Sequence, residues 1–151
     1  EEIMATLKVK IQEDIILSNQ DYGSKRTLEI ASIDEVMKRI VTCAASQTTT
    51  VAVFNSNAYG AAGAVDIEDS KYIRITNLDS SNAVELAVVG AATLYQVNLA
   101  AGQSHILGSA DGLMLSEADT SPSFGTMADL GSIQVNPGGN AVDVELFIAS
   151  A

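Results

Sequence analysis

Apolar and polar residues alternate along most of this chain, and a period of two is the signature of strands that bury one face. Alternating stretches cover residues 7–12, 28–30, 72–76, 84–88, 133–135 and 142–148, and the β-branched run 48–54 is typical of a more fully buried strand. Turn-forming residues separate these stretches at 19–23, 77–82, 100–103 and 136–140. The pattern predicts nine to eleven strands in one all-β domain over residues 1–151, a β-sandwich or jelly-roll-like fold.

Residues 32–40 fit two structures. Ile33, Val36, Met37 and Ile40 have helical spacing, and Ser32 with Glu35 forms a capping box that predicts one short helix. A strand over residues 36–43 fits the same segment. The prediction is therefore at most one short helix in the domain, with residues 1–6 as an extended N-terminal arm.

Two segments predict long loops. Residues 55–70 are rich in Ala, Gly, Asn and acidic residues, and residues 116–132 are rich in Ser, Thr, Pro and Gly around Phe124, Met127 and Leu130. Loops of this length are uncommon in compact domains unless they bind something or pack on a partner. The three apolar side chains are costly to expose as a patch, so they pack either on the domain's own core or on a partner.

The charge is acidic and unevenly distributed. The 151 residues carry 8 Lys and Arg against 19 Asp and Glu, a net charge of −11. All the cations lie between Lys8 and Arg74, and residues 75–151 hold eight acidic residues with no Lys or Arg. This balance argues against binding of nucleic acid or an anionic membrane. The uneven distribution fits a solvated acidic surface, or a basic N-terminal part that docks on an acidic partner.

Catalytic chemistry has little to build on. The chain has one histidine, His105, one cysteine, Cys43, and no tryptophan. We expect His105 to be a structural or surface residue and Cys43 to be a small buried apolar residue, because a nucleophilic site needs a paired base. Loop carboxylates such as those of residues 66–69 are potential Ca²⁺ ligands, but they match no calcium motif. We expect no enzyme activity, no catalytic or metal-ligating residue and no cofactor.

A resemblance that covers most of the chain emerges from residues 71–104, and residues 4–11 and 33–42 fit the same pattern. The segment Lys71-Tyr72-Ile73-Arg74-Ile75-Thr76-Asn77-Leu78-Asp79 precedes two strands and then Leu99-Ala100-Ala101-Gly102-Gln103-Ser104. This pattern resembles small β-rich virion proteins of tailed bacteriophages, marine ones in particular. The resemblance implies a structural protein, most simply a capsid decoration or cement protein on the virion surface, made in the host cytoplasm.

The partners implied are the major capsid protein or other virion proteins, together with further copies of the chain, a trimer being favoured by analogy with capsid symmetry. For the contact surface we expect Leu7, Val9, Phe124, Met127 and Leu130 to contribute. The alternative function is a β-sandwich binding module in a tail or fibre that recognises a carbohydrate or cell-surface ligand. Its ring platforms would have to come from Tyr22, Tyr59, Tyr72 and Tyr95.

Overall fold

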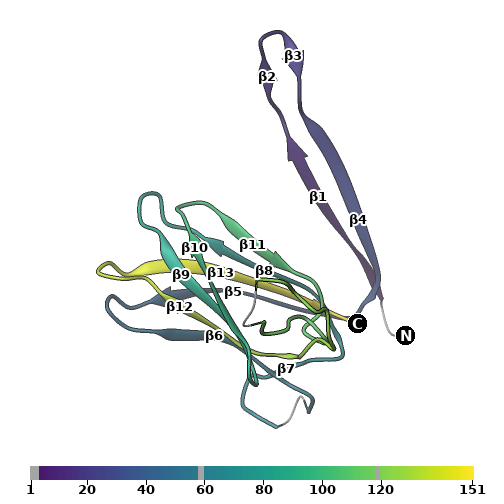
Figure 1. Ribbon diagram of the computed structural model, residues 1–151, viewed down its shortest axis with the longest axis vertical. Coiled ribbons are helices and arrows are strands. Elements are labelled where there is room, and N and C mark those ends of the chain that lie inside the picture. Colours follow the sequence, from purple (N-terminus) through teal and green to yellow (C-terminus); the bar gives the residue numbers. More distant parts are fainter. Residues whose placement is uncertain (1–3, 58–59, 118–119) are drawn as a thin grey trace.

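Two antiparallel sheets pack face to face, and a long hairpin projects from one end of the sandwich they form (Figure 1). The computed structural model describes residues 4–57, 60–117 and 120–151. Over these residues the chain forms thirteen strands and no helix, three of the strands being only two residues long. The predicted all-β sandwich is confirmed.

The first sheet has five strands in the order β10-β9-β12-β6-β7. They are β6 (Thr49–Asn55), β7 (Val65–Asp66), β9 (Val84–Gly90), β10 (Leu94–Leu99) and β12 (Leu130–Asn136). The second sheet has the order β11-β8-β13-β5, with β5 (Glu35–Cys43), β8 (Ser70–Asn77), β11 (Ser104–Leu107) and β13 (Val142–Ser150). Every pairing in the two sheets is antiparallel except that of β6 with β7.

The alternating pattern explains how the core forms. In β13, Val142, Val144, Leu146 and Ile148 face inward and are buried, while the residues between them face outward. Ile73 and Ile75 of β8 do the same, and the five-stranded sheet contributes its own buried set from the opposite side. The two inner faces thus enclose one continuous core, as in other aligned sandwiches.

Polar side chains link the two sheets on both sides of the sandwich. On one edge the hydroxyl of Tyr95 in β10 lies 3.0 Å from Nε2 of His105 in β11, with the rings edge to face. On the other edge the guanidinium of Arg39 in β5 donates to the carbonyl oxygen of Val51 in β6 at 2.6 Å. Each contact joins a strand of one sheet to a strand of the other.

The hairpin consists of β1 (Ala5–Glu13) and β4 (Ser24–Ile33), extended at its far end by β2 (Ile16–Leu17) and β3 (Gln20–Asp21). Its strands pair with each other and with no strand of the two sheets. At about 3.3 Å per residue, β1 alone is about 30 Å long. Residues 1–3 of the predicted N-terminal arm lie outside the described residues, and Ala5 and Thr6 begin β1.

A small apolar cluster, here called the base cluster, holds the hairpin on the outer face of the second sheet. Ile33, Tyr72 and Ala149 are its buried members, and partly buried members pack around them: Leu7, Val9, Ile30, Phe147 and Ala151. The rings of Tyr72 and Phe147 meet edge to face at 5.9 Å. The amide of Asp34, just after the hairpin, donates to the carbonyl oxygen of Ser150 at 3.1 Å.

The helical alternative for residues 32–40 is wrong. Ser32 and Ile33 end β4, and the strand alternative over residues 36–43 is confirmed, because Glu35–Cys43 forms β5 and pairs with β13 over nine residues. Met37 and Val41 face the core, while Val36 and Ile40 face outward and are exposed. Apolar residues on both faces of a strand imitated helical spacing, and pairing with β13 outweighed the local capping signal.

In their described parts, both predicted long segments are mostly irregular, and residues 58–59 and 118–119 lie outside the described residues. The first segment contains β7, and Ala128 of the second forms an isolated bridge with Met114, which precedes it. Leu130 begins β12 and is fully buried in the core, so it offers no surface to a partner.

Candidate interaction surface

One face of the hairpin is apolar, and it faces the second sheet across a wedge-shaped groove. Register places Val9 opposite Leu28 and Ile11 opposite Arg26, and cross-strand neighbours share a face. Ile11 and Leu28 are exposed. The other face is polar and carries an ion pair between Lys8 and Glu29, 3.2 Å between Nζ and Oε1.

The groove lies between this hairpin face and the outer face of β8 and β11. Its wider part has a volume of about 410 Å³, and Val9, Ile11 and Leu28 line one side of it. Tyr72 and Ile106 line the other side. A second part, of about 310 Å³, continues along the hairpin beside Arg74 and Phe147. The two parts together are called the wedge groove.

The far end of the hairpin, residues 13–23, is called the tip. Ile15, Ile16, Leu17 and Tyr22 are all exposed there, Ile16 to 75%. Three acidic residues accompany them, Glu13, Asp14 and Asp21, and the tip contains no Lys or Arg. It is therefore an apolar and acidic element that stays exposed among the described residues.

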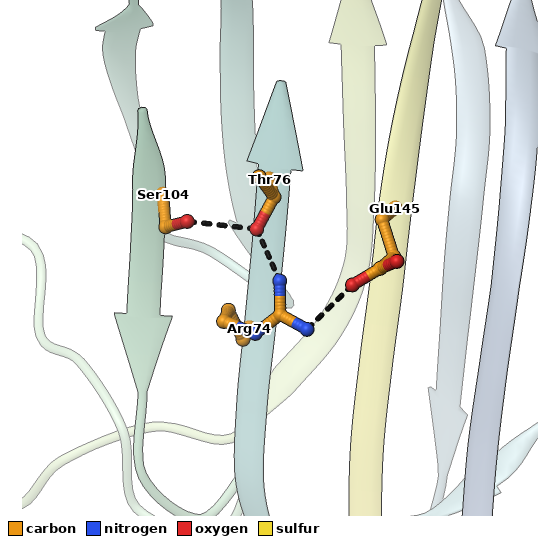
Figure 2. A network of polar contacts seen from close by, with 4 residues as sticks. All are labelled: Arg74, Thr76, Ser104 and Glu145. Carbon is orange, nitrogen blue, oxygen red and sulfur yellow. Dashed lines mark hydrogen bonds and ion pairs between the residues drawn. The ribbon is translucent and has the colours of Figure 1, made fainter. Parts of the chain in front are cut away.

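A ladder of polar side chains crosses the outer face of the second sheet beside the wedge groove (Figure 2). The guanidinium of Arg74 donates to Oε1 of Glu145 at 2.6 Å and also donates to the Thr76 hydroxyl, which lies 2.7 Å from the hydroxyl of Ser104. Arg74 also lies over the ring of Phe147, 5.6 Å from its centroid. The hydrogen bond from Arg74 lowers the pKa of the Glu145 carboxyl, so this pair stays ionised.

The interface residues expected from the sequence are dispersed in the structure. Leu7 and Val9 are partly buried in the base cluster, where they hold the hairpin, and Val9 also lines the wedge groove. Phe124 and Met127 lie on the second long loop and are exposed, Phe124 to 80%. Phe124 and Met127 are thus exposed on this loop, apart from the hairpin residues Leu7 and Val9.

Sequence reasoning missed the exposed apolar residues of the tip, Ile16 and Leu17, together with Leu28 and Ile106, which line the groove. A signal for the tip was present, because Ile15-Ile16-Leu17 is an apolar run between Asp14 and the turn residues Ser18 and Asn19. The groove had no local signal, since its walls come from segments almost eighty residues apart in the sequence.

His105 and Cys43, the two residues considered for catalytic chemistry, lie within the sandwich. Burial lowers the pKa of His105, whose ring contacts Tyr95 between the sheets. Cys43 is fully buried, and burial raises the pKa of its thiol. Among the described residues, no group of three or more His, Cys, Asp or Glu is placed to hold a metal ion.

Asn77 and Asp79, in the segment that carries the phage resemblance, organise a turn. The fully buried amide of Asn77 donates to the carbonyl oxygens of Asn82 and Leu99, at 2.8 and 3.0 Å. The carboxylate of Asp79 accepts backbone N–H bonds from Asn82 and Ser81, which lower its pKa. The motif thus stabilises the connection between β8 and β9.

The three described tyrosines that a carbohydrate-binding module would need do not form a common platform. Tyr22 is exposed at the tip, Tyr72 is buried in the base cluster, and Tyr95 lies at the sandwich edge. Tyr59 lies outside the described residues.

Comparison with known proteins identifies no family. No protein-family model and no curated protein matches the sequence. Among solved structures, the chain is similar to one from Bacillus endospore appendages, described as a novel family of disulfide-linked pili. The identity is 10%, the match covers 76% of this chain and 85% of that one, and the TM-score is 0.42, too low to support a functional argument. Within the described part of the chain, no helix is long and apolar enough to cross a membrane.

Proposed function

We propose that this chain is a non-enzymatic structural subunit of a larger protein assembly, and that its projecting hairpin is the element that engages a neighbour. The observation that carries the proposal is the hairpin itself, which extends from the sandwich with one apolar face and an apolar tip uncovered.

The free energy of burying apolar side chains favours a neighbour that covers the hairpin. An isolated two-stranded hairpin is marginally stable in water, and this one has no third strand along its length. Full burial of an Ile or Leu side chain is worth about 2 kcal/mol. Covering Ile16, Leu17 and Leu28 by a neighbour would therefore stabilise both the contact and the hairpin.

The non-enzymatic part of the proposal is supported by the positions of the chain's single histidine and single cysteine. His105 is held against Tyr95 between two edge strands, and Cys43 is fully buried in the sandwich core. The Cys43 thiol is thus shielded from a substrate, and the His105 ring contacts a tyrosine hydroxyl, not the serine or cysteine of a nucleophile–base pair.

We further propose that the assembly is the virion of a tailed bacteriophage, where the chain acts as a decoration or cement protein on the capsid and forms homo-oligomers, with a trimer as the favoured state. The resemblance of residues 71–104 to small phage virion proteins supports this assignment. The hairpin supplies a docking element, and the acidic residues of the second half of the chain keep the outward surface solvated.

The test is binding of the purified chain to capsids of its encoding phage prepared without this protein. We expect the wild-type chain to co-sediment with them and to raise the temperature at which they disrupt. The double variant Ile16→Asp/Leu17→Asp should lose binding. Leu94→Asp is the matched control, because Leu94 is 54% exposed on the outer face of the other sheet. Capsids that bind neither the wild-type chain nor the control would overturn the capsid assignment.

A further inference from the structure

We propose that the hairpin tip of one copy of this chain docks in the wedge groove of a second copy, so that the subunits associate head to tail. This inference rests on the homo-oligomer part of the proposed function and names the surfaces that meet.

The two surfaces match in apolar character. The tip presents Ile15, Ile16 and Leu17 on a narrow two-stranded end. The groove presents Ile11, Leu28 and Ile106, which are each about half exposed. Docking would cover both sets in one contact.

The surfaces also match in charge. The tip has Asp14 and Asp21 and no cation, while Arg26 and Lys71 line the wider part of the groove. Among the described residues, none of these four side chains takes part in an ion pair within the chain. Opposite unpaired charges on the two surfaces favour this occupant over a basic or purely apolar partner.

The tip of the same copy does not reach the groove. Val9, Ile11 and Leu28 of the groove wall belong to the hairpin whose other end is the tip, and Figure 1 shows this end directed away from the sandwich. A tip that docks in the groove therefore belongs to another molecule. Because the two surfaces differ, the contact is heterologous, and it generates a closed ring or an open filament.

This geometry predicts a complementation that a symmetric contact does not. The tip variant Ile16→Asp/Leu17→Asp retains an intact groove, and the groove variant Leu28→Asp/Ile106→Asp retains an intact tip. Each variant alone should run as a monomer of 15.7 kDa in size-exclusion chromatography with light scattering. Their equimolar mixture should form a dimer of twice that mass and nothing larger, since only one functional tip and one functional groove remain.

Folding of each variant is checked by circular dichroism and thermal unfolding, and Leu94→Asp again serves as the control that should assemble like wild type. A cross-linking measurement leaves both surfaces apolar. Chains carrying Leu17→Cys and chains carrying Ile106→Cys should form a covalent dimer with a short bis-maleimide only when mixed, because Cys43 is fully buried.

Three results would overturn the proposal. A wild-type chain that stays monomeric at all concentrations would overturn both this contact and the proposed homo-oligomer. It would not affect the proposed capsid binding, which the co-sedimentation experiment tests separately. An oligomer that still forms in both the tip variant and the groove variant would place the contact elsewhere. Loss of the oligomer in Ile40→Asp, on the edge strand β5, would then point to that edge. Cross-linking of the Leu17→Cys chain to itself would show a tip-to-tip contact.

Discussion

Truncation of Ile33 tests whether the hairpin and the sandwich are separate packing units. Ile33 is 4% exposed in the base cluster, which shares no buried residue with the sandwich core. The hairpin has no strand pairing with the sheets, and it joins them through this cluster and through the chain at Asp34. We therefore expect Ile33→Ala to loosen the hairpin selectively.

The magnitude follows from the size of the side chain. Replacing a buried Ile by Ala costs about 2–5 kcal/mol in a well-packed site. The base cluster is small and borders an open groove, so we expect the low end, about 2 kcal/mol. That corresponds to a change of about 30-fold in the equilibrium between the attached and detached hairpin. A detached two-stranded hairpin is itself marginal, so its amides should lose protection with it.

Hydrogen exchange read by mass spectrometry separates the two units. In Ile33→Ala, peptides from β1 and β4 should exchange about 30-fold faster, while peptides from β8 and β13 stay close to wild type. The matched control is Val144→Ala in β13, a fully buried core position whose truncation should accelerate exchange throughout the chain and lower the global unfolding midpoint. Uniform acceleration in Ile33→Ala, or a midpoint lowered as much as in Val144→Ala, would refute the separation.

Three further predictions concern polar groups of the sandwich. Burial lowers the pKa of His105 from its ordinary value of 6.5, so the neutral ring stabilises the fold fully above pH 6.5 and this contribution is lost as the pH falls below that value. His105→Gln should therefore flatten the pH dependence of the unfolding free energy between pH 7 and 5. Tyr95→Phe, which removes the hydroxyl bonded to the ring, should cost about 1 kcal/mol in urea unfolding. The lowered pKa of Glu145 means that its ionised carboxylate stabilises the fold above pH 4.5 and that this stabilisation is lost at lower pH. Glu145→Gln should lower the free energy of unfolding by about 1 kcal/mol at pH 7, and an equal decrease at pH 2 would contradict the pairing with Arg74. Asn77→Ala removes the amide that donates to the buried carbonyl oxygen of Leu99 and the partly buried one of Asn82, and it should cost about 2 kcal/mol in thermal or urea unfolding; a variant as stable as wild type would show that this turn does not depend on the amide.

The sequence pattern predicted the sandwich because period-two alternation depends mainly on which face of a strand is buried. Strands β8, β9, β12 and β13 all lie at the expected positions, and Cys43 is buried as expected. The pattern misled where a strand is apolar on both faces, as in β5, because outward Val36 and Ile40 completed a helical spacing.

The interaction surface was less predictable, for a different physical reason. Leu130 was expected at a partner interface from its loop neighbours, but it is the first residue of a buried strand. The wedge groove depends on how the hairpin meets β8 and β11, which is a long-range contact with no local periodicity. The alternation at residues 7–12 and 28–30, with turn residues at 19–23, predicts two strands in this region, but it does not predict that they leave the sandwich as a hairpin.

The molecular mass of the purified wild-type chain, measured by light scattering across a range of concentrations, tests the central claim most directly. An assembly subunit that docks by its hairpin should show a mass that is a multiple of 15.7 kDa and should revert to 15.7 kDa in Ile16→Asp/Leu17→Asp. A wild-type chain that remains at 15.7 kDa at every concentration would contradict self-association through the hairpin.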